Sequence, residues 1–164
     1  LVYSTPPLAE EMEVCGPLKV RLWAATSGKD TDWTAKVLAV HPDGYAQRLN
    51  DGIIRARYRK GLDRPEPVTP GQAEEYEIDC WATCIRLARG YSLRLEISSS
   101  AFPKFDRNLN TGGPIGKEST WVVADQTVYH DAERPSYLLV PVVPKAKAPA
   151  AAAAGKGGIA EVTR

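Results

Sequence analysis

The stretch SSSAFPKFDRNLNTGG, residues 98–113, combines three serines, an Asp-Arg pair and two asparagines with a closing Gly pair. Serine hydroxyls can act as nucleophiles and a charged pair can bind a substrate, so the stretch is a candidate active-site loop. A serine nucleophile, however, needs a general base within about 3 Å. Whether the stretch is catalytic or structural therefore depends on whether the chain supplies the other parts of an active site.

The motifs that would supply those parts are absent from the sequence. The α/β-hydrolase nucleophile sits in a G-x-S-x-G elbow, and the nearest approach, GYSLR at 90–94, ends in arginine and begins an alternating strand around Ser92. His41 opens a Pro-Asp-Gly turn. His130 lies close in sequence only to the hydroxyl of Ser136, and sequence proximity does not make a catalytic pair. We predict no catalytic residue in this chain.

Metal and cofactor sites are also not expected. Asp30 and Asp32 flank Thr31 just before a strand, where short polar side chains cap turns, and a metal would need further oxygen ligands. The segment TSGKDT lacks the first glycine of a phosphate loop and the hydroxyl that follows its lysine. We therefore expect no metal and no cofactor.

The chain has three cysteines, Cys15, Cys80 and Cys84. An odd number in a chain long enough to bury a core argues against a disulfide framework and favours a reducing compartment. The CWATC spacing fits neither a zinc site nor a C-x-x-C redox motif. The expectation is three buried, unreactive thiols in a cytoplasmic protein.

Length and charge limit the kinds of partner. A chain of 164 residues fits one domain, and its net charge of +1 gives no field to attract nucleic acid. Apolar runs such as YLLVPVV are far shorter than the ~20 residues that span a bilayer, and the N-terminus lacks the order of a signal peptide. We expect no nucleic-acid partner and no membrane span.

Alternation of apolar and polar residues predicts an all-β chain. In PLKVRLWAAT the apolar set is Leu18, Val20, Leu22 and Ala24, and DWTAKVLAVHPDGYAQRL predicts a hairpin turning at HPDG. About seven strands follow from this reading, with Pro-rich residues 61–72 as a loop, and they favour a β-sandwich. In DGIIRARYRK the alternation puts Arg55, Arg57 and Arg59 on a solvated strand face, with an anion site as the alternative. Residues 145–164, rich in Ala, Gly and Lys, predict a disordered tail.

Four blocks of the chain resemble the C-terminal domain of the X-Pro dipeptidyl-peptidase and cocaine-esterase (CocE/NonD-type) serine hydrolases. They are residues 1–26, 30–59, 89–113 and 126–144, and they carry the phrases DTDW, HPDG, NDGIIRARYR and FDRNLNTGG in the family's order. The resemblance covers 1–144 and implies a jelly-roll, galactose-binding-like sandwich. It also implies that the catalytic triad belongs to an α/β-hydrolase domain upstream of Leu1.

The same resemblance implies that this chain begins partway through the domain. The sandwich would then lack its first strands, and each missing inward aliphatic would forfeit ~1.5 to 3 kcal/mol of burial. We expect such a piece to be marginally stable alone, with an exposed sheet edge and an exposed apolar face.

Two functions from different classes follow. The first is a noncatalytic sandwich that packs on the catalytic domain and helps to shape its cleft or a homo-oligomer. The alternative is a free-standing carbohydrate- or peptide-binding module, which exposed aromatic side chains in a concave patch would favour. The residues to inspect for that alternative are Trp23, Trp33, Trp81 and Trp121.

In the first of these functions, the loop 98–113 is either a structural connection or a border of the cleft or domain interface. In the structural reading, Asp106 and Arg107 pair with neighbours such as Arg55 or Asp51, and Phe102 and Phe105 pin the loop to the sandwich. The candidate interface residues are Phe102, Phe105, Asp106, Arg107, Asn108 and Asn110.

Overall fold

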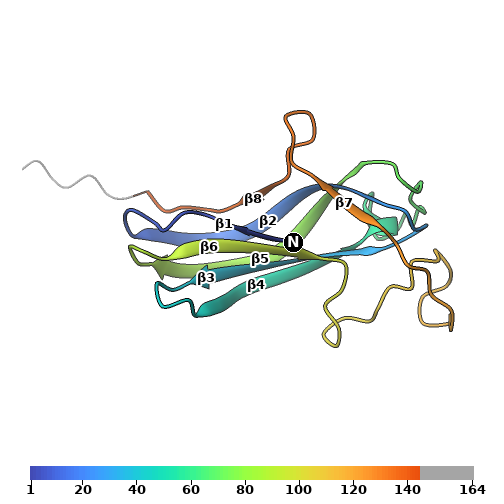
Figure 1. Ribbon diagram of the computed structural model, residues 1–164, viewed down its shortest axis with the longest axis horizontal. Coiled ribbons are helices and arrows are strands. Elements are labelled where there is room, and N and C mark those ends of the chain that lie inside the picture. The colour runs from blue at the N-terminus through green and yellow to red at the C-terminus, as the bar shows by residue number, and fades with distance from the viewer. Residues whose placement is uncertain (145–164) are drawn as a thin grey trace, which may run out of the picture.

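The computed structural model describes residues 1–144, which form two antiparallel sheets packed face to face (Figure 1). This confirms the predicted all-β sandwich. One sheet has the order β1 (Val2–Ser4), β6 (Ser92–Ser98), β3 (Asp32–Val40) and β4 (Ala46–Arg55). The other has the order β5 (Glu74–Leu87), β2 (Met12–Thr26) and β7 (Gln126–Tyr129), and β8 (Tyr137–Leu139) also pairs with β2.

Within the described residues the only helical segment is a 3₁₀ turn, Ala56–Tyr58. No helix in this part of the chain is long and apolar enough to cross a membrane. The expected disordered tail, 145–164, lies outside the described residues.

The core lies between the two sheets and follows the predicted alternation. Leu18, Val20, Leu22 and Ala24 of β2 are all buried, as expected for one face of a strand. They meet the inward side chains of the opposite sheet, where the Trp33 ring packs 5.9 Å from the Tyr76 ring, centroid to centroid. Burial of such side chains, at about 1.5–3 kcal/mol each, is the main force holding the two layers together.

The predicted hairpin is also present, as β3 and β4. Its turn is closed by a hydrogen bond from the His41 amide to the Tyr45 carbonyl, and Asp43 accepts from the Tyr45 amide. Gly44 takes a positive φ of 91°, which only glycine adopts at little cost. The Pro-Asp-Gly sequence therefore terminates β3 where expected, whereas β1 was not among the predicted strands.

β7 and β8 behave as one strand with an interruption. β7 pairs with Trp23–Thr26 of β2, β8 pairs with Lys19–Arg21, and Val142 bridges to Val14 further along the same edge. The intervening turn, 130–136, is held by Ser136, whose hydroxyl donates to the Tyr129 carbonyl and accepts from the Trp23 amide. This side of β2 is thus covered by a discontinuous strand.

The sandwich is closed along one side, where β4 lies against β5. The Asn50 side-chain amide donates to the carbonyls of Cys80, at 2.7 Å, and Ala82, at 3.1 Å. A Cβ atom on Gly52 would lie 2.1 Å from the Asp79 carbonyl oxygen, so only glycine permits this approach. Asn50 and Gly52 therefore join the two sheets at this side.

A bulge in β5 lies at the same place. Two residues, Cys80 and Trp81, occupy the position opposite Leu18, and the register shifts there. Trp81 has a φ of +62° and is 73% exposed, and its amide is bound by the Asp79 carboxylate at 2.8 Å. A tryptophan in this left-handed conformation is strained, because its Cβ approaches its own carbonyl.

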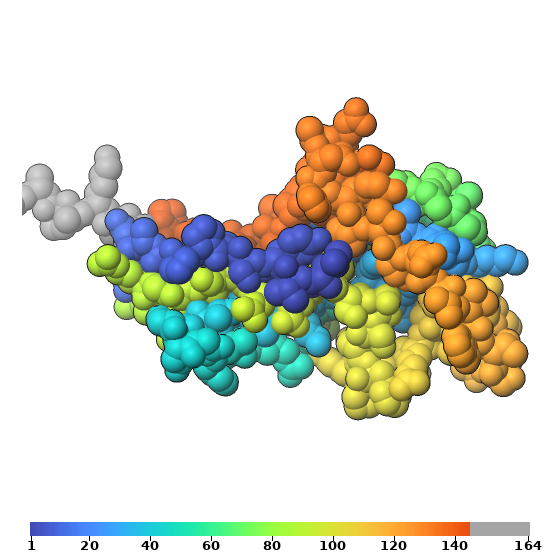
Figure 2. Space-filling model, in the orientation of Figure 1, coloured from blue at the N-terminus to red at the C-terminus, as the bar shows by residue number. Residues whose placement is uncertain are grey.

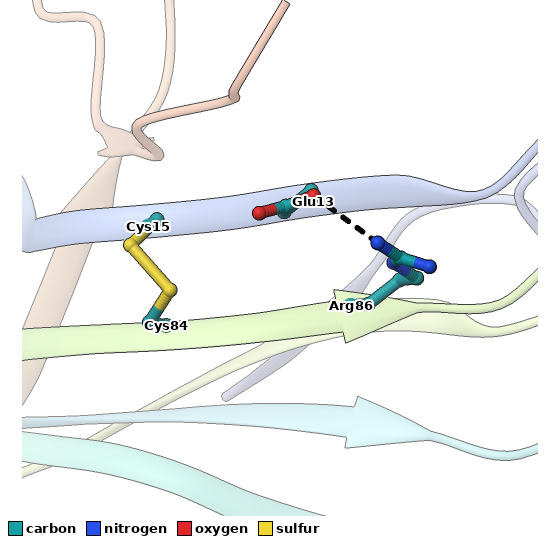
Figure 3. The surroundings of a disulfide bond; sticks show 4 residues. All are labelled: Glu13, Cys15, Cys84 and Arg86. Carbon is teal, nitrogen blue, oxygen red and sulfur yellow. Dashed lines mark ion pairs between the residues drawn. A yellow bond between two sulfur atoms is a disulfide. The ribbon is translucent and has the colours of Figure 1, made fainter. Parts of the chain in front are cut away.

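The cysteine prediction was wrong for two of the three residues. Cys15 of β2 and Cys84 of β5 are directly opposed in the ladder and form a disulfide on the outer face of the sheet (Figure 3). Next to it, Arg86 Nη2 lies 3.6 Å from Glu13 Oε2, in the same pair of strands. The inference of a reducing, cytoplasmic compartment therefore loses the support that it drew from unpaired thiols.

Cys80 meets the expectation of a buried, unreactive thiol. It is fully buried, and burial is the main cause that raises the pKa of its thiol to about 12. The nearby carboxylates of Asp79 and Asp51 act in the same direction. At neutral pH this thiol is protonated and a poor nucleophile.

Candidate functional site

The three arginines expected on a solvated strand face are mostly buried, so that interpretation was wrong; Arg55 and Arg57 bind buried aspartates, and Arg59 lies 3.4 Å from Glu74. β4 ends at Arg55 and the 3₁₀ turn begins at Ala56, which breaks the alternation. Arg55 binds Asp32 through two bonds of 2.8 and 3.0 Å, and Arg57 Nε binds Asp30 at 2.7 Å. We call Asp30, Asp32, Arg55, Arg57 and Asn108 the ion cluster.

Burial makes these pairs strong structural constraints. Asp30 and Asp32 are 0% and 1% exposed, and a buried carboxylate is tolerated only when it is paired and hydrogen-bonded. The bidentate Asp32 contact, partly opposed by burial, raises the pKa of the Arg55 guanidinium. Asp30 also accepts from the Arg57 amide at 3.0 Å, so it caps the 3₁₀ turn as well as pairing with the side chain.

The ion cluster anchors the long connection between β6 and β7. The Asn108 side-chain amide donates to Asp30 at 3.1 Å and to Asp32 at 2.9 Å. Arg57 Nη2 donates to the Gly113 carbonyl at 3.0 Å. The loop, 99–125, projects from one end of the sandwich (Figure 1), and its base is fixed to the start of β3 and the end of β4.

The candidate interface residues of this loop do not form one constellation. Asn108 belongs to the ion cluster, whereas Asn110, with a φ of 61°, donates to the Val122 carbonyl within the loop. Arg107 stacks its guanidinium 4.5 Å from the Phe102 ring centroid, and Phe102 is 58% exposed. Phe105, half-buried, lies below the Lys104 ammonium at 5.2 Å.

Two of the expected loop contacts are therefore corrected. Asp51 is bound by Lys104 at 2.6 Å and Arg55 by Asp32, so neither pairs with Asp106 or Arg107 as suggested. Phe102 does not pin the loop to the sandwich, because most of its ring is exposed.

A small pocket of about 200 Å³ lies against the ion cluster. Its charged lining carries both signs, with Arg107 and the two cluster arginines beside Asp106 and Glu118. Because Arg55 and Arg57 are already neutralised by buried aspartates, the pocket has no excess positive charge with which to hold an anion. Its geometry fits a structural role at the base of the loop.

A larger feature is an apolar groove of about 510 Å³ on the side of the sandwich opposite β4 and β5. Its floor contains core side chains of both sheets, and its walls are β1 on one side and β7 with β8 on the other. Figure 2 shows the N-terminal segment and residues 126–143 running beside each other on this face. The apolar lining residues are Val20, Leu22, Leu93, Leu95, Ile97, Val128, Leu138 and Val140.

The polar residues at the groove do not form a catalytic arrangement. The Tyr3 ring of β1 and the ring of His130, the residue after β7, meet edge to face with centroids 6.3 Å apart. Ser136 uses its hydroxyl to join β2 to the turn after β7, as described above. Across residues 1–144, no group of three His, Cys, Asp or Glu side chains could hold a metal ion.

Known proteins identify the fold. The family model described as the X-Pro dipeptidyl-peptidase C-terminal non-catalytic domain matches residues 1–139. The chain belongs to this family. Among curated proteins, it is 41% identical over 145 residues to the cocaine esterase of Rhodococcus sp. (strain MB1 Bresler). That match covers 87% of this chain and 25% of the esterase, so the domain spans about a quarter of its relative's length.

Solved structures give the same picture of this domain family. An aminopeptidase from the marine sediment archaeon Thaumarchaeota archaeon matches with a TM-score of 0.83 and 33% identity, over 88% of this chain and 26% of its own. An alpha-amino acid ester hydrolase matches with a TM-score of 0.83 and 32% identity, over 87% of this chain and 25% of its own. A CocE/NonD family hydrolase from Staphylococcus aureus shares the fold. It matches with a TM-score of 0.71 and 14% identity, over 87% of this chain and 30% of its own.

Sequence reasoning missed the ion cluster and did not locate the groove, although the family resemblance led us to expect an exposed sheet edge and an exposed apolar face. The cluster had a signal, since DTD at the start of β3 and RAR at the end of β4 place acids and bases with the same two-residue spacing at one end of a hairpin. The groove had none in the sequence alone, because it depends on which strands lie at the edges of the two sheets.

Proposed function

We propose that this chain is the noncatalytic C-terminal sandwich of a CocE/NonD-type serine hydrolase and that it packs on the catalytic α/β-hydrolase domain. The substrates of that enzyme would be acyl esters, amides or X-Pro dipeptides. The observation that carries the proposal is the family match over 1–139, together with relatives, named as an esterase, an aminopeptidase and an ester hydrolase, that are about four times longer.

The surface of the domain supports a packing role. The loop 99–125 carries exposed apolar side chains, including Trp121 and Val123, and monomeric proteins seldom leave such side chains grouped on the surface. Its base is held by the ion cluster, so these side chains are presented on a fixed support. A fixed loop with apolar side chains suits a permanent contact with another domain and can border that domain's cleft.

The carbohydrate-binding alternative receives less support. Trp33 lies in the core and Trp23 is half-buried, which leaves Trp81 and Trp121 as the exposed tryptophans of the described chain. Trp81 is on β5 and Trp121 is in the loop before β7, and neither lines the groove or the small pocket. A sugar platform would need such rings grouped along one concave surface.

Two finer features belong to this proposal. The jelly-roll, galactose-binding-like topology follows from the family resemblance, and the two antiparallel sheets are consistent with it. A contribution to a homo-oligomer follows from the same source, and the exposed apolar side chains of the loop 99–125 are a surface that could serve it.

The experiment compares the 164-residue chain with the longer hydrolase that the proposal predicts. A fluorophosphonate probe labels active serine hydrolases, so we expect it to label the longer protein and not the 164-residue chain. A longer protein that is never labelled, or a 164-residue chain that is, would contradict the proposal.

A pair of substitutions tests the packing surface. Trp121→Ser should lower the thermal midpoint of the longer hydrolase, because it removes an apolar contact between domains. Leu62→Ser is the matched control, since Leu62 is even more exposed, at 82%, but lies in the loop 61–72 outside the proposed surface. Equal effects of the two substitutions would count against the packing role of the loop.

A further inference from the structure

The Cys15–Cys84 disulfide is open to solvent in the folded chain. Both cysteines are exposed, and they are directly opposed residues of β2 and β5 on the face of the sheet that points away from the core (Figure 3). Exposed disulfides are easier to reduce than buried structural ones, and a reductant reaches them without unfolding the protein. The bond is therefore accessible to thiol–disulfide exchange in the native state.

The surface beside the disulfide is apolar. The next outward pair of the ladder is Pro17 and Ala82, both exposed, and Trp81, adjacent to Ala82 at the bulge, is 73% exposed. Residues 14–18 and 80–85, which face each other across the ladder, include no charged side chain. An exposed apolar surface of this kind is typical of a contact site for another protein. We call Cys15, Pro17, Trp81, Ala82 and Cys84 the disulfide face.

The disulfide face lies far from the loop 99–125, which is proposed to pack on another domain. That loop joins the far end of β2, where the Ser27 amide donates to the Asp125 carbonyl at 3.0 Å. Cys15 lies 11 residues before Thr26, the last residue of β2, and at ~3.3 Å per residue this is roughly 36 Å. The two surfaces therefore do not overlap.

The strands hold the two cysteines opposite each other independently of the bond. The ladder of β2 with β5 is continuous from Met12 to Pro17, and the Glu13–Arg86 ion pair crosses it next to the disulfide (Figure 3). Reduction would thus leave two thiols side by side, in position to form the bond again. The third cysteine, Cys80, is fully buried and does not compete for them.

We propose that the Cys15–Cys84 disulfide is a reversible exchange site for a dithiol oxidoreductase, a protein with a C-x-x-C motif, which docks on the disulfide face. A thiolate of the oxidoreductase attacks one of the two sulfurs, the bond between them breaks, and a mixed disulfide forms. The second thiol of the oxidoreductase then displaces the chain from the mixed disulfide. Two electrons and two protons pass from the C-x-x-C dithiol, which is oxidised to a disulfide, to Cys15 and Cys84, which become thiols.

The apolar surroundings favour a protein over a small thiol as the reductant. A small thiol needs only access to a sulfur, whereas a protein must also bury the surface around the bond, and a surface without charges is less costly to desolvate. The proposal concerns this chain alone and does not depend on the function proposed for the longer hydrolase.

The first test uses thioredoxin as the dithiol protein and the folded 164-residue chain. Thioredoxin should reduce the bond at a rate that rises with its concentration. A thioredoxin variant with serine at the second C-x-x-C cysteine should be trapped as a one-to-one mixed disulfide with the chain, detected by mass spectrometry. A reduction rate independent of thioredoxin concentration would overturn the proposal, because reduction would then follow unfolding of the chain. Absence of the trapped complex would also overturn it.

A matched pair of substitutions separates docking from mere exposure. Ala82→Gln places a neutral amide beside the disulfide and changes neither cysteine. It should slow reduction by thioredoxin at least roughly fivefold, because the amide is buried without a partner in the complex, and leave reduction by dithiothreitol unchanged. Thr127→Gln, at an exposed position of β7 in the same sheet, is the control and should change neither rate. Equal thioredoxin rates for the two variants would refute docking on this face.

Reoxidation tests whether the site is reversible. Oxidised glutathione added to the reduced chain should restore the Cys15–Cys84 bond and leave Cys80 as the one thiol that is alkylated in denaturant. A product in which Cys80 has entered a disulfide would show that the reduced strands lose their register, and the reversible site would then be wrong.

Discussion

Reduction of the Cys15–Cys84 disulfide should destabilise this domain by several kcal/mol. The bond joins residues 69 apart in sequence, and the loop-entropy relation gives about 4 kcal/mol for a loop of this length. Both sulfurs lie on the outer face of the β2–β5 ladder, so breaking the bond between them exposes little apolar area. Nearly all of the loss should therefore come from the greater freedom of the unfolded chain.

The loss on reduction should be a large fraction of the domain's net free energy of unfolding, because the apolar groove is left uncovered. Small domains have net stabilities of ~5 to 15 kcal/mol, and an uncovered apolar groove places this chain toward the lower end. A loss of about 4 kcal/mol corresponds to a fall of roughly 10 °C in thermal midpoint for a chain of this size.

Urea unfolding of the 164-residue chain with and without a phosphine reductant measures this difference. The Cys15→Ala/Cys84→Ala double variant is the control, because it should match the reduced chain and ignore the reductant. Alkylation in denaturant without reductant should modify one thiol, that of Cys80. Coincident unfolding curves, or three alkylated thiols, would refute the reasoning.

Three other substitutions test separate parts of the fold. Asp32→Ala should lower the free energy of unfolding in urea by about 3 kcal/mol, because it leaves the largely buried Arg55 guanidinium without its partner. A decrease below about 1 kcal/mol would show that the pair does not constrain the fold. Trp81→Gly should raise the free energy of unfolding by about 1 kcal/mol in calorimetry, because glycine adopts a positive φ without strain. Trp121→Gly is the control and should not raise it. A lower stability of Trp81→Gly would show that Trp81 is not strained. Because the folded pKa of Cys80 is raised, the stability associated with its protonated thiol is fully present below the unfolded pKa of about 9. This stability is lost as pH rises toward 12, by up to roughly 4 kcal/mol. Cys80→Ala should lack that alkaline loss, and identical pH profiles would contradict the assignment.

The elements of the fold were predictable where alternation and turn chemistry are local. The inward set of β2 and the HPDG turn between β3 and β4 need only a few neighbouring residues to be recognised, and the structure confirms both. The strand β1 was missed because three exposed residues carry no alternation. The predicted absence of a catalytic site rested on a local motif as well, and it stays a prediction.

The ion cluster shows why the rest could not be read from the sequence. Counting outward from Val40 opposite Ala46 places Asp32 opposite Ile54, with Arg55 one residue beyond. The register shift between Val37 and Leu38 moves the ladder by one residue and brings Arg55 opposite Asp32. The register shift therefore makes Arg55 the partner of Asp32, and no local pattern in β3 predicts that shift. The disulfide depends likewise on the register of β2 and β5.

The interrupted strand beside β2 also has a consequence for how the domain is made. β2 emerges from the ribosome early, yet its partners β7 and β8 are more than 100 residues further along the chain. Contacts of such long range form slowly, because the intervening chain must first be ordered. During synthesis, one backbone edge of β2 must therefore stay unpaired until nearly the entire domain has been translated. Any domain encoded upstream would already have had time to fold, and its surface would be the first one that β2 meets.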